Sequence, residues 1–173
     1  FAVTHMPISK SFLKFLEAKK AKYELVEHRR VFTAYDKAAT LHVDPKTVVK
    51  TAVFQAGSKE HALVFVPASK HIDKKKVKTA INIWLRAQSK KPESKVDFAT
   101  EQWMKKNMSG DVGATAALPE ALGMYAFVDG ALFKPAKLYL NIGSYEVSIS
   151  VNQANFKKIL GKSFVKGAFA KAK

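Results

Sequence analysis

Lys50 is a charged residue inside a short apolar run, which makes it the first candidate for chemistry in this sequence. The run covers residues 47–55, Thr-Val-Val-Lys-Thr-Ala-Val-Phe-Gln, between Asp44-Pro45 and Ala56-Gly57-Ser58. Such a run, bounded by turn residues, is typical of a buried β-strand. An ammonium buried there would lose water, its pKa would fall, and it would meet an anion, a developing oxyanion or a polar substrate group. Alternatively, Lys50 lies on the wet face of a half-exposed strand, which the lysine-rich composition favours.

A glycine-rich stretch, residues 109–123, is the second candidate. It contains Gly110, Gly113 and Gly123 among small residues, with Pro119 near its end. Its side chains are too small for a core helix, and it is not polar enough for a linker. Glycines let the backbone approach a ligand closely, and their amides can form an anion-binding nest. The alternative is an ordinary irregular loop.

Hydroxyl groups at Thr33 and Ser144 add to this modest set of groups. Such a set could hydrolyse a bond that is already activated, and the ester of an aminoacyl-tRNA is one. The ester carbonyl needs orientation, an ordered water and donors aimed at the oxyanion. An ammonium and loop amides can supply those donors, and the ribose hydroxyl beside the ester can help to position the water.

The residues that other catalytic classes need are missing or badly spaced. None of the five histidines is paired at a metal-binding spacing, and no carboxylate cluster accompanies them, so we expect no zinc or magnesium site. The chain has no cysteine, hence no thiol nucleophile and no Cys-ligated zinc. It also contains no Walker loop, no dinucleotide fingerprint and no G-x-S-x-G elbow. We therefore expect chemistry without a metal or a cofactor.

The elements that must position these groups are helices mixed with hairpin-connected strands. Residues 47–55 and 61–66 are expected to pair as an antiparallel hairpin. This order favours an α+β fold over a doubly wound sheet. The expected helices are 9–21, 33–41, 73–87, 100–106 and 152–160, and the expected strands are 23–28, 47–55, 61–66, 124–128, 137–142 and 145–151.

The length of 173 residues suggests a single domain covering 1–173, with a core at about 23–160. The alternation in 145–151 predicts a strand with one wet face, which carries Ser148 and Ser150. The segment 162–173 contains four lysines and no acidic residue, and we expect a mobile basic arm or a linker stub.

The charge of the chain points to a polyanionic partner. Lys and Arg number 30 against 14 acidic residues, a net charge of +16. Such a charge concentrates polyanions near the protein, and phosphate contacts release counterions and give salt-dependent affinity. Nucleic acid is therefore the expected partner, with an anionic membrane surface or plain solubility as alternatives. A phosphate-facing surface, or else a solvated helix face, is expected at Lys74, Lys75, Lys76 and Lys78.

No apolar run is long enough to span a membrane, and no secretory signal is visible. The absence of cysteine fits a reducing compartment. We therefore expect a cytoplasmic protein without a membrane partner.

Several groups of residues follow the order and spacing of a known family. They are 23–28 followed by Thr33-Ala34 and Ala38-Ala39; Val48-Val49-Lys50-Thr51; Gly110-Asp-Val-Gly113 up to Pro119; Val128-Asp129; Leu140 to Ser144; and 147–151 with the closing helix. Together they resemble the YbaK/ProX family of aminoacyl-tRNA deacylases, which includes editing domains associated with prolyl-tRNA synthetase. The resemblance covers roughly residues 23–160.

The resemblance implies a mixed sheet curled into a barrel-like core with surrounding helices, and metal-independent hydrolysis of mischarged tRNA at its 3′ end. Lys50 takes the place of the essential lysine, which contacts the aminoacyl ester or its ribose. Gly113 takes the loop position that holds the aminoacyl group through the backbone, and Thr33 and His28 match positions near the acceptor end. The full predicted substrate-binding set is Gly113, Gly110, Thr33, His28, Gly143 and Ser144.

Two features depart from the family pattern. Five residues separate Gly113 from Pro119, where the family often has three. No histidine follows His71, whereas some alanine-specific members carry one late in the chain. The first departure bears on the shape of the pocket, and the second argues against alanyl-tRNA as the substrate.

Three hypotheses of function follow. The first is an aminoacyl-tRNA deacylase that edits mischarged tRNA, in trans or as a domain appended to a synthetase. The second is a catalytically weak tRNA-binding module in a synthetase assembly. The third is a basic protein-interaction domain with no tRNA function. The expected partners under the first two are tRNA and an aminoacyl-tRNA synthetase or synthetase complex.

Overall fold

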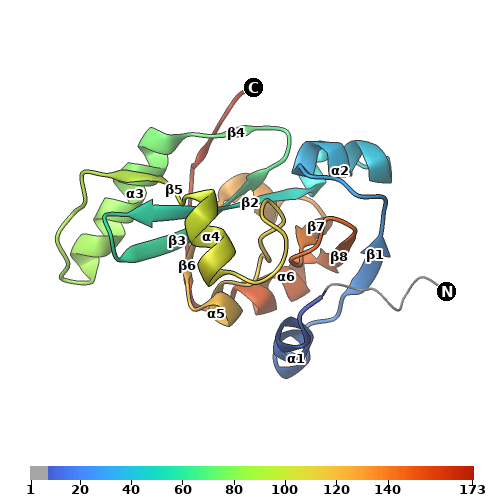
Figure 1. The fold of residues 1–173 in the computed structure, drawn as a ribbon. Coiled ribbons are helices and arrows are strands. Elements are labelled where there is room, and N and C mark those ends of the chain that lie inside the picture. The colour runs from blue at the N-terminus through green and yellow to red at the C-terminus, as the bar shows by residue number, and fades with distance from the viewer. Residues whose placement is uncertain (1–7) are drawn as a thin grey trace.

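The computed structural model describes residues 8–173, which form the α+β fold predicted from the sequence (Figure 1). Two short 3₁₀ turns, Pro45–Thr47 and Gly130–Phe133, connect strands. The helices are α1 Lys10–Ala18, α2 Ala34–Leu41, α3 Lys74–Ala87, α4 Glu101–Asn107, α5 Pro119–Leu122 and α6 Gln153–Leu160. The strands are β1 Glu24–Glu27, β2 Val49–Ala56, β3 Glu60–Pro67, β4 His71–Ile72, β5 Val96–Phe98, β6 Tyr125–Asp129, β7 Lys137–Asn141, β8 Val147–Asn152, β9 Phe164–Gly167 and β10 Ala170–Lys171.

Two larger sheets build most of the molecule, and β10 and β4 form a small two-stranded sheet beside them. The five-stranded sheet has the order β5-β2-β3-β6-β9; β2 and β3 form the expected antiparallel hairpin, and β6 and β9 add in parallel. The three-stranded sheet has the order β1-β8-β7 and is antiparallel. A single parallel bridge between Val48 and Tyr139 connects them. Within residues 8–173 the two sheets therefore meet at a seam and do not close into a barrel.

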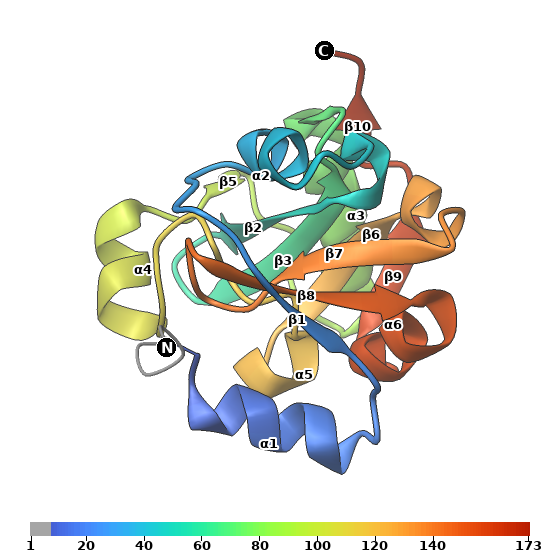
Figure 2. The same ribbon diagram turned by 90° about the vertical axis from the view of Figure 1, so that its right-hand side faces the viewer.

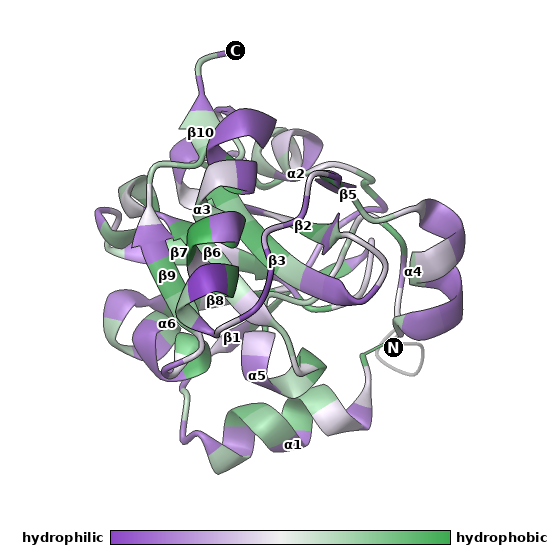
Figure 3. Ribbon diagram, turned by 90° about the vertical axis from the view of Figure 1, so that its left-hand side faces the viewer, coloured by the Kyte–Doolittle hydropathy of each residue, from purple (hydrophilic) through white to green (hydrophobic). Residues whose placement is uncertain are grey.

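One face of the five-stranded sheet is covered by α3. Asp73 caps this helix by accepting hydrogen bonds from the amides of Lys75 and Lys76 at 3.1 and 3.2 Å. Its apolar residues recur every four positions and face the sheet. The helix contributes Val77, Ile81 and Leu85 to a cluster with Phe54, Val64 and Phe127. The outward face is mostly hydrophilic but exposes Ile83, whereas the strands beneath are hydrophobic (Figure 3).

The main core lies between the other face of this sheet and the three-stranded sheet. Phe65 of β3 and Leu140 of β7 are both fully buried there. The helices α1 and α6 contribute Leu16 and Phe156 to the same cluster. This core fixes the two sheets against one another, and it thereby fixes the seam between β2 and β7.

Two expectations from the sequence were wrong. Ser148 and Ser150 are buried, not wet, because β8 is the central strand of its sheet and the His28 side chain lies against Ser148. The segment 162–173 is not a mobile arm, because β9 pairs with β6 and β10 pairs with β4. The C-terminal end thereby lies on the same side of the molecule as α2 (Figure 2).

No helix in the part of the chain that the structure describes has both the length and the apolar composition needed to cross a membrane.

Candidate functional site

Three segments that are distant in the sequence converge at one end of the three-stranded sheet: residues 28–33, the glycine loop 109–118, and residues 141–148. The amide of Val31 donates to the carbonyl of Tyr145 at 3.1 Å, which joins the first segment to the third. The amide of Gly143 donates to the carbonyl of Ala114 at 2.9 Å, which joins the third segment to the loop. The structure thus brings together the predicted glycines, His28, Thr33 and Ser144.

Gly110 and Gly113 both adopt a positive φ, and Gly110 also allows a close backbone approach. Gly110 has φ +90°, and an added Cβ would lie 2.5 Å from the carbonyl oxygen of Gly143. Gly113 has φ +92°, and an added Cβ would lie 3.4 Å from the carbonyl oxygen of Phe32. A side chain is strained at such φ values. Gly110 therefore lets the loop pack directly against the 141–143 segment, whereas Gly113 is favoured by its positive φ alone.

Two residues that sequence reasoning missed, Asp111 and Tyr145, hold the loop in place. The Asp111 carboxylate accepts a hydrogen bond from the Tyr145 amide at 2.8 Å. The Tyr145 hydroxyl donates to the carbonyl of Val112. The Asp111 amide donates to the carbonyl of Gly143 at 2.9 Å. The loop is therefore held from both sides.

A cavity of about 260 Å³ lies beside this loop. Gly110 and Gly143 line it together with apolar side chains of α1 and of the turn that follows β7. The full lining is Ile8, Ser9, Phe12, Ser109, Gly110, Ile142 and Gly143. Two of the predicted substrate-binding residues thus border an open volume.

The two predicted hydroxyl groups are engaged in local structure. Thr33 is the N-cap of α2, and its hydroxyl oxygen accepts a hydrogen bond from the Asp36 amide at 3.1 Å. Ser144 is fully buried, and its hydroxyl oxygen accepts from the amides of Glu146 and Val147 at 3.0 and 3.2 Å. Both hydroxyls therefore position the backbone of the site.

His28 is fixed by two hydrogen bonds. Nδ1 lies 2.9 Å from the carbonyl oxygen of Arg29, and Nε2 lies 2.9 Å from the hydroxyl of Ser148. A carbonyl can only accept, so Nδ1 carries the proton and, in the neutral ring, Nε2 accepts from the serine hydroxyl. Burial lowers the pKa of His28 from its ordinary value, which favours the neutral ring.

Lys37 is a second lysine of the site, and sequence reasoning missed it. Its side chain is only 3% exposed, and its ammonium donates a hydrogen bond to Oδ1 of Asn141. Burial lowers the pKa of Lys37 to about 8. The sequence signal was a lysine on the same helical stripe as Ala34, Ala38 and Leu41.

Asn141 connects this buried lysine to the glycine loop. Its side chain accepts from Lys37, and its main-chain carbonyl accepts from the Ala117 amide at 3.0 Å. Ser148, the cross-strand partner of Asn141, hydrogen-bonds to His28. We call His28, Lys37, Asn141 and Ser148 the polar cluster.

Lys50 lies on β2 two residues after the Val48 bridge, at the seam between the sheets. Its side chain is half-buried, and burial, followed by the nearby charge of Lys173, lowers its pKa. Within residues 8–173 no hydrogen bond or ion pair occupies its ammonium. The Lys173 ammonium in turn lies 4.0 Å from the ring centroid of Tyr35. Phe32, which the loop touches, and Tyr35, which lies under Lys173, thus stand three residues apart at the start of α2.

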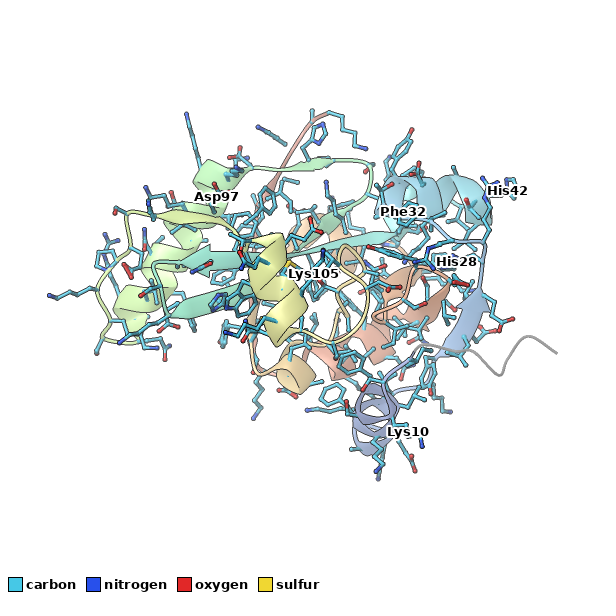
Figure 4. All side chains as sticks on the ribbon, viewed as in Figure 1. Lys10, His28, Phe32, His42, Asp97 and Lys105 are labelled. Carbon is cyan, nitrogen blue, oxygen red and sulfur yellow. The ribbon has the colours of Figure 1, made fainter. Side chains whose placement is uncertain are left out.

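The four basic residues predicted on the 73–87 helix lie elsewhere. Lys74, Lys75, Lys76 and Lys78 are exposed on α3, at the other end of the five-stranded sheet from α2. Lys74 forms an ion pair with Asp97 at 2.8 Å. Asp97 lies on the α3 side of the molecule, away from His28 and Phe32 (Figure 4). The structure therefore does not bring these lysines to the site.

In residues 8–173, no three or more His, Cys, Asp or Glu side chains gather in a group that could hold an ion. The site can donate hydrogen bonds through one half-buried ammonium and through loop amides.

Comparison with known proteins gives one family. The model of the aminoacyl-tRNA editing domain matches residues 28–159. No curated protein sequence matches the chain.

Solved structures share the fold at low sequence identity. The crystal structure of a hypothetical protein superposes with a TM-score of 0.73 at 17% identity, covering 94% of this chain and 100% of that one. A proposed trans-editing enzyme for prolyl-tRNA synthetase gives a TM-score of 0.68 at 16% identity, covering 95% and 99%. A proposed signal transduction protein from Marinobacter aquaeolei gives 0.60 at 10% identity, covering 94% of this chain and 31% of that one.

Proposed function

Because the chain belongs to the aminoacyl-tRNA editing domain family, we propose that it hydrolyses the ester bond of mischarged tRNA without a metal. The observation that carries this proposal is the ammonium of Lys50, which is half-buried at the seam of the two sheets and has no acceptor within residues 8–173. An ammonium with reduced hydration interacts strongly with a developing negative charge.

In the proposed reaction, water attacks the carbonyl carbon of the aminoacyl ester. Lys50 donates a hydrogen bond to the carbonyl oxygen, which becomes negatively charged in the tetrahedral intermediate. The bond between the carbonyl carbon and the ribose oxygen then breaks. One proton of the attacking water ends on the ribose oxygen and the other is released to solvent, so the amino acid leaves as a carboxylate. The neighbouring ribose hydroxyl helps to position the water.

The glycine loop supplies further donors in this proposal. The amides of Val112 and Gly113 donate no hydrogen bond within the described part of the chain, and both residues are at least partly exposed. Asp111 and Tyr145 hold these amides in a defined orientation. Pre-oriented amides can bind the aminoacyl group with little reorganisation. His28, Thr33, Gly110, Gly143 and Ser144 keep this arrangement in place.

The decisive experiment is a panel of mischarged tRNAs, each incubated with the wild-type protein and with two lysine variants. We expect the wild type to hydrolyse at least one, and Lys50→Ala to lose at least about 100-fold in rate, as when one oxyanion donor is removed. Lys59→Ala is the matched control, because Lys59 is an exposed lysine in the turn of the same hairpin. If every mischarged tRNA survives the wild type, the enzymatic proposal is wrong.

A tRNA-binding module with little turnover is the second candidate. Two observations favour it: the net charge of +16, and the engagement of the Thr33 and Ser144 hydroxyls in local structure. This candidate predicts tRNA binding whose affinity falls steeply with salt, without ester hydrolysis.

Residues 1–173 act as one editing unit in this proposal, and its substrate is mischarged tRNA. A synthetase partner is proposed by analogy with the solved neighbour, a proposed trans-editing enzyme for prolyl-tRNA synthetase. A tRNA substrate would place the activity in the compartment where translation occurs. The four exposed lysines of α3 are proposed to contact phosphates away from the site.

A further inference from the structure

Two aromatic side chains at the start of α2 are largely exposed. Phe32 is 59% exposed and Tyr35 is 52% exposed. They stand three residues apart, on either side of the Thr33 cap and the first helical residue. Exposed rings that border a functional site are typical contact residues for ligands.

We propose that Phe32 and Tyr35 form a stacking platform for the unpaired bases at the 3′ end of tRNA, an inference that rests on the proposed function. Proteins that bind single-stranded nucleic acid combine exposed aromatic rings with cationic groups that follow the backbone. Both parts of that combination are present here.

The Phe32 ring is held in place before any ligand binds. It packs edge-on against Tyr145, with ring centroids 4.8 Å apart and an interplanar angle of 76°. Tyr145 is itself fixed to the glycine loop at Asp111 and Val112. An exposed ring with a fixed orientation loses little conformational entropy when a base stacks on it.

Cations flank both rings. The Arg30 guanidinium lies 5.8 Å from the centroid of Phe32 and 5.1 Å from that of Tyr145, and it pairs with Glu146 at 3.2 Å. The Lys173 ammonium lies 4.0 Å from the centroid of Tyr35. These charges suit the phosphates that join stacked nucleotides, which favours RNA over an apolar protein segment as the occupant.

The position of the platform also fits the proposed chemistry. Gly113 packs against the Phe32 carbonyl, and the charge next to Tyr35, Lys173, acts on Lys50. Bases stacked on residues 32–35 would therefore lie next to the glycine loop.

The test compares two short single-stranded RNAs: one with the sequence of a tRNA 3′ end, and one of equal length with abasic sugars, which keeps the phosphates and removes the bases. Phe32→Leu and Tyr35→Leu keep apolar volume but remove the aromatic face. We expect each variant to bind the RNA with bases about five- to tenfold more weakly and the abasic RNA as well as the wild type does.

Phe98→Leu is the matched control. Phe98 is 43% exposed and also has a cation beside it, Lys74 at 5.1 Å, but it lies on β5, on the α3 side of the molecule and away from α2. We expect this variant to bind both RNAs as the wild type does. Melting temperatures of all three variants identify any loss of folding.

If Phe32→Leu and Tyr35→Leu lost equal affinity for the two RNAs, or lost none for either, the proposed platform would be refuted. Its failure is distinguishable from failure of the proposed function. Aromatic-dependent binding by a wild type that hydrolyses no mischarged tRNA would support the platform and refute the deacylase. Hydrolysis with an unchanged KM in both leucine variants would refute the platform and support the deacylase.

Discussion

The two sheets of this protein differ in what they bury. In the five-stranded sheet, the centre of β3 is a continuous apolar run, Leu63-Val64-Phe65-Val66, which is fully buried on both faces. In the three-stranded sheet, one face carries the polar cluster instead, of which Lys37, Asn141 and Ser148 are buried and His28 is half-buried. Apolar burial stabilises a fold, whereas buried polar groups stabilise it only when each finds a partner. The difference separates a region that maintains the fold from a region that is organised around hydrogen-bonding groups.

Lys50 lies on a strand of the apolar five-stranded sheet, but it is close to the edge where that sheet meets the three-stranded sheet. It lies on β2 of the five-stranded sheet, two residues from the bridge to β7. Lys37, by contrast, is sealed within the second region. A half-buried lysine can reach a substrate, so the proposed function gives the contact with the ester to Lys50, and we propose that Lys37 positions the loop through Asn141.

The largest effect on stability should come from the apolar sheet. Phe65→Ala removes a fully buried ring, and we expect the free energy of unfolding to fall by about 3–5 kcal/mol. Urea unfolding monitored by circular dichroism measures it. If a single substitution in the polar cluster lowered the free energy of unfolding more than Phe65→Ala does, the five-stranded sheet would not be the main source of stability.

A smaller decrease is expected from Asn141→Leu. This change leaves the buried Lys37 ammonium without its acceptor, and we expect the free energy of unfolding to fall by about 2–3 kcal/mol. Adding Lys37→Met should recover most of that decrease, because an apolar pair of similar volume replaces a charge and its partner. The same unfolding measurement on both variants decides the point; a double variant no more stable than the single one would contradict it.

The buried Lys37 should make the stability of the protein depend on pH. The pKa of Lys37 is lowered to about 8 in the folded state, so the unfolded state binds more protons above that pH, and stability rises with pH. Between about pH 7.5 and about pH 9, the free energy of unfolding of the wild type should rise by about 1 kcal/mol relative to that of Lys37→Met. A constant difference between the two proteins across this range would show that burial does not lower the pKa of Lys37.

The smallest effect concerns α3, the basic helix far from the polar cluster. Replacing Lys75 and Lys76 with Gln should reduce the slope of log affinity for tRNA against log salt by about 0.9 for each phosphate that the variant no longer neutralises. Replacing Lys10 and Lys14, which are exposed or partly exposed on α1, is the matched control. An unchanged slope in the α3 variant would confine the tRNA to the end of the molecule that carries α2.

Local signals in the sequence predicted much of the fold. The caps Thr33 and Asp73 begin their helices as expected, because a side-chain oxygen that accepts from a nearby amide depends only on neighbouring residues. The β2–β3 hairpin was predicted because its two strands are also neighbours in the sequence, separated only by a short turn. The parallel pairing of β6 and β9 was not, since it joins segments that no local pattern connects.

In the site, too, local motifs were predicted and long-range contacts were missed. The family resemblance selected Gly110, Gly113 and Gly143, which the structure brings into one loop region. The anchors Asp111 and Tyr145 were missed, because their partners lie more than 30 residues away. The burial of Lys37 was missed because it depends on which face of α2 meets β7.

The hydrogen bonds of the glycine loop make its opening measurable by amide hydrogen exchange. The amides of Asp111, Ala117 and Gly143 all donate across the contact between the loop and the 141–143 segment. Their exchange with deuterium therefore requires the loop to lift away, and it follows that single opening event. A non-hydrolysable aminoacyl-tRNA mimic that seats against the loop should slow exchange at these three amides together, which would register occupancy even in a variant that cannot turn over.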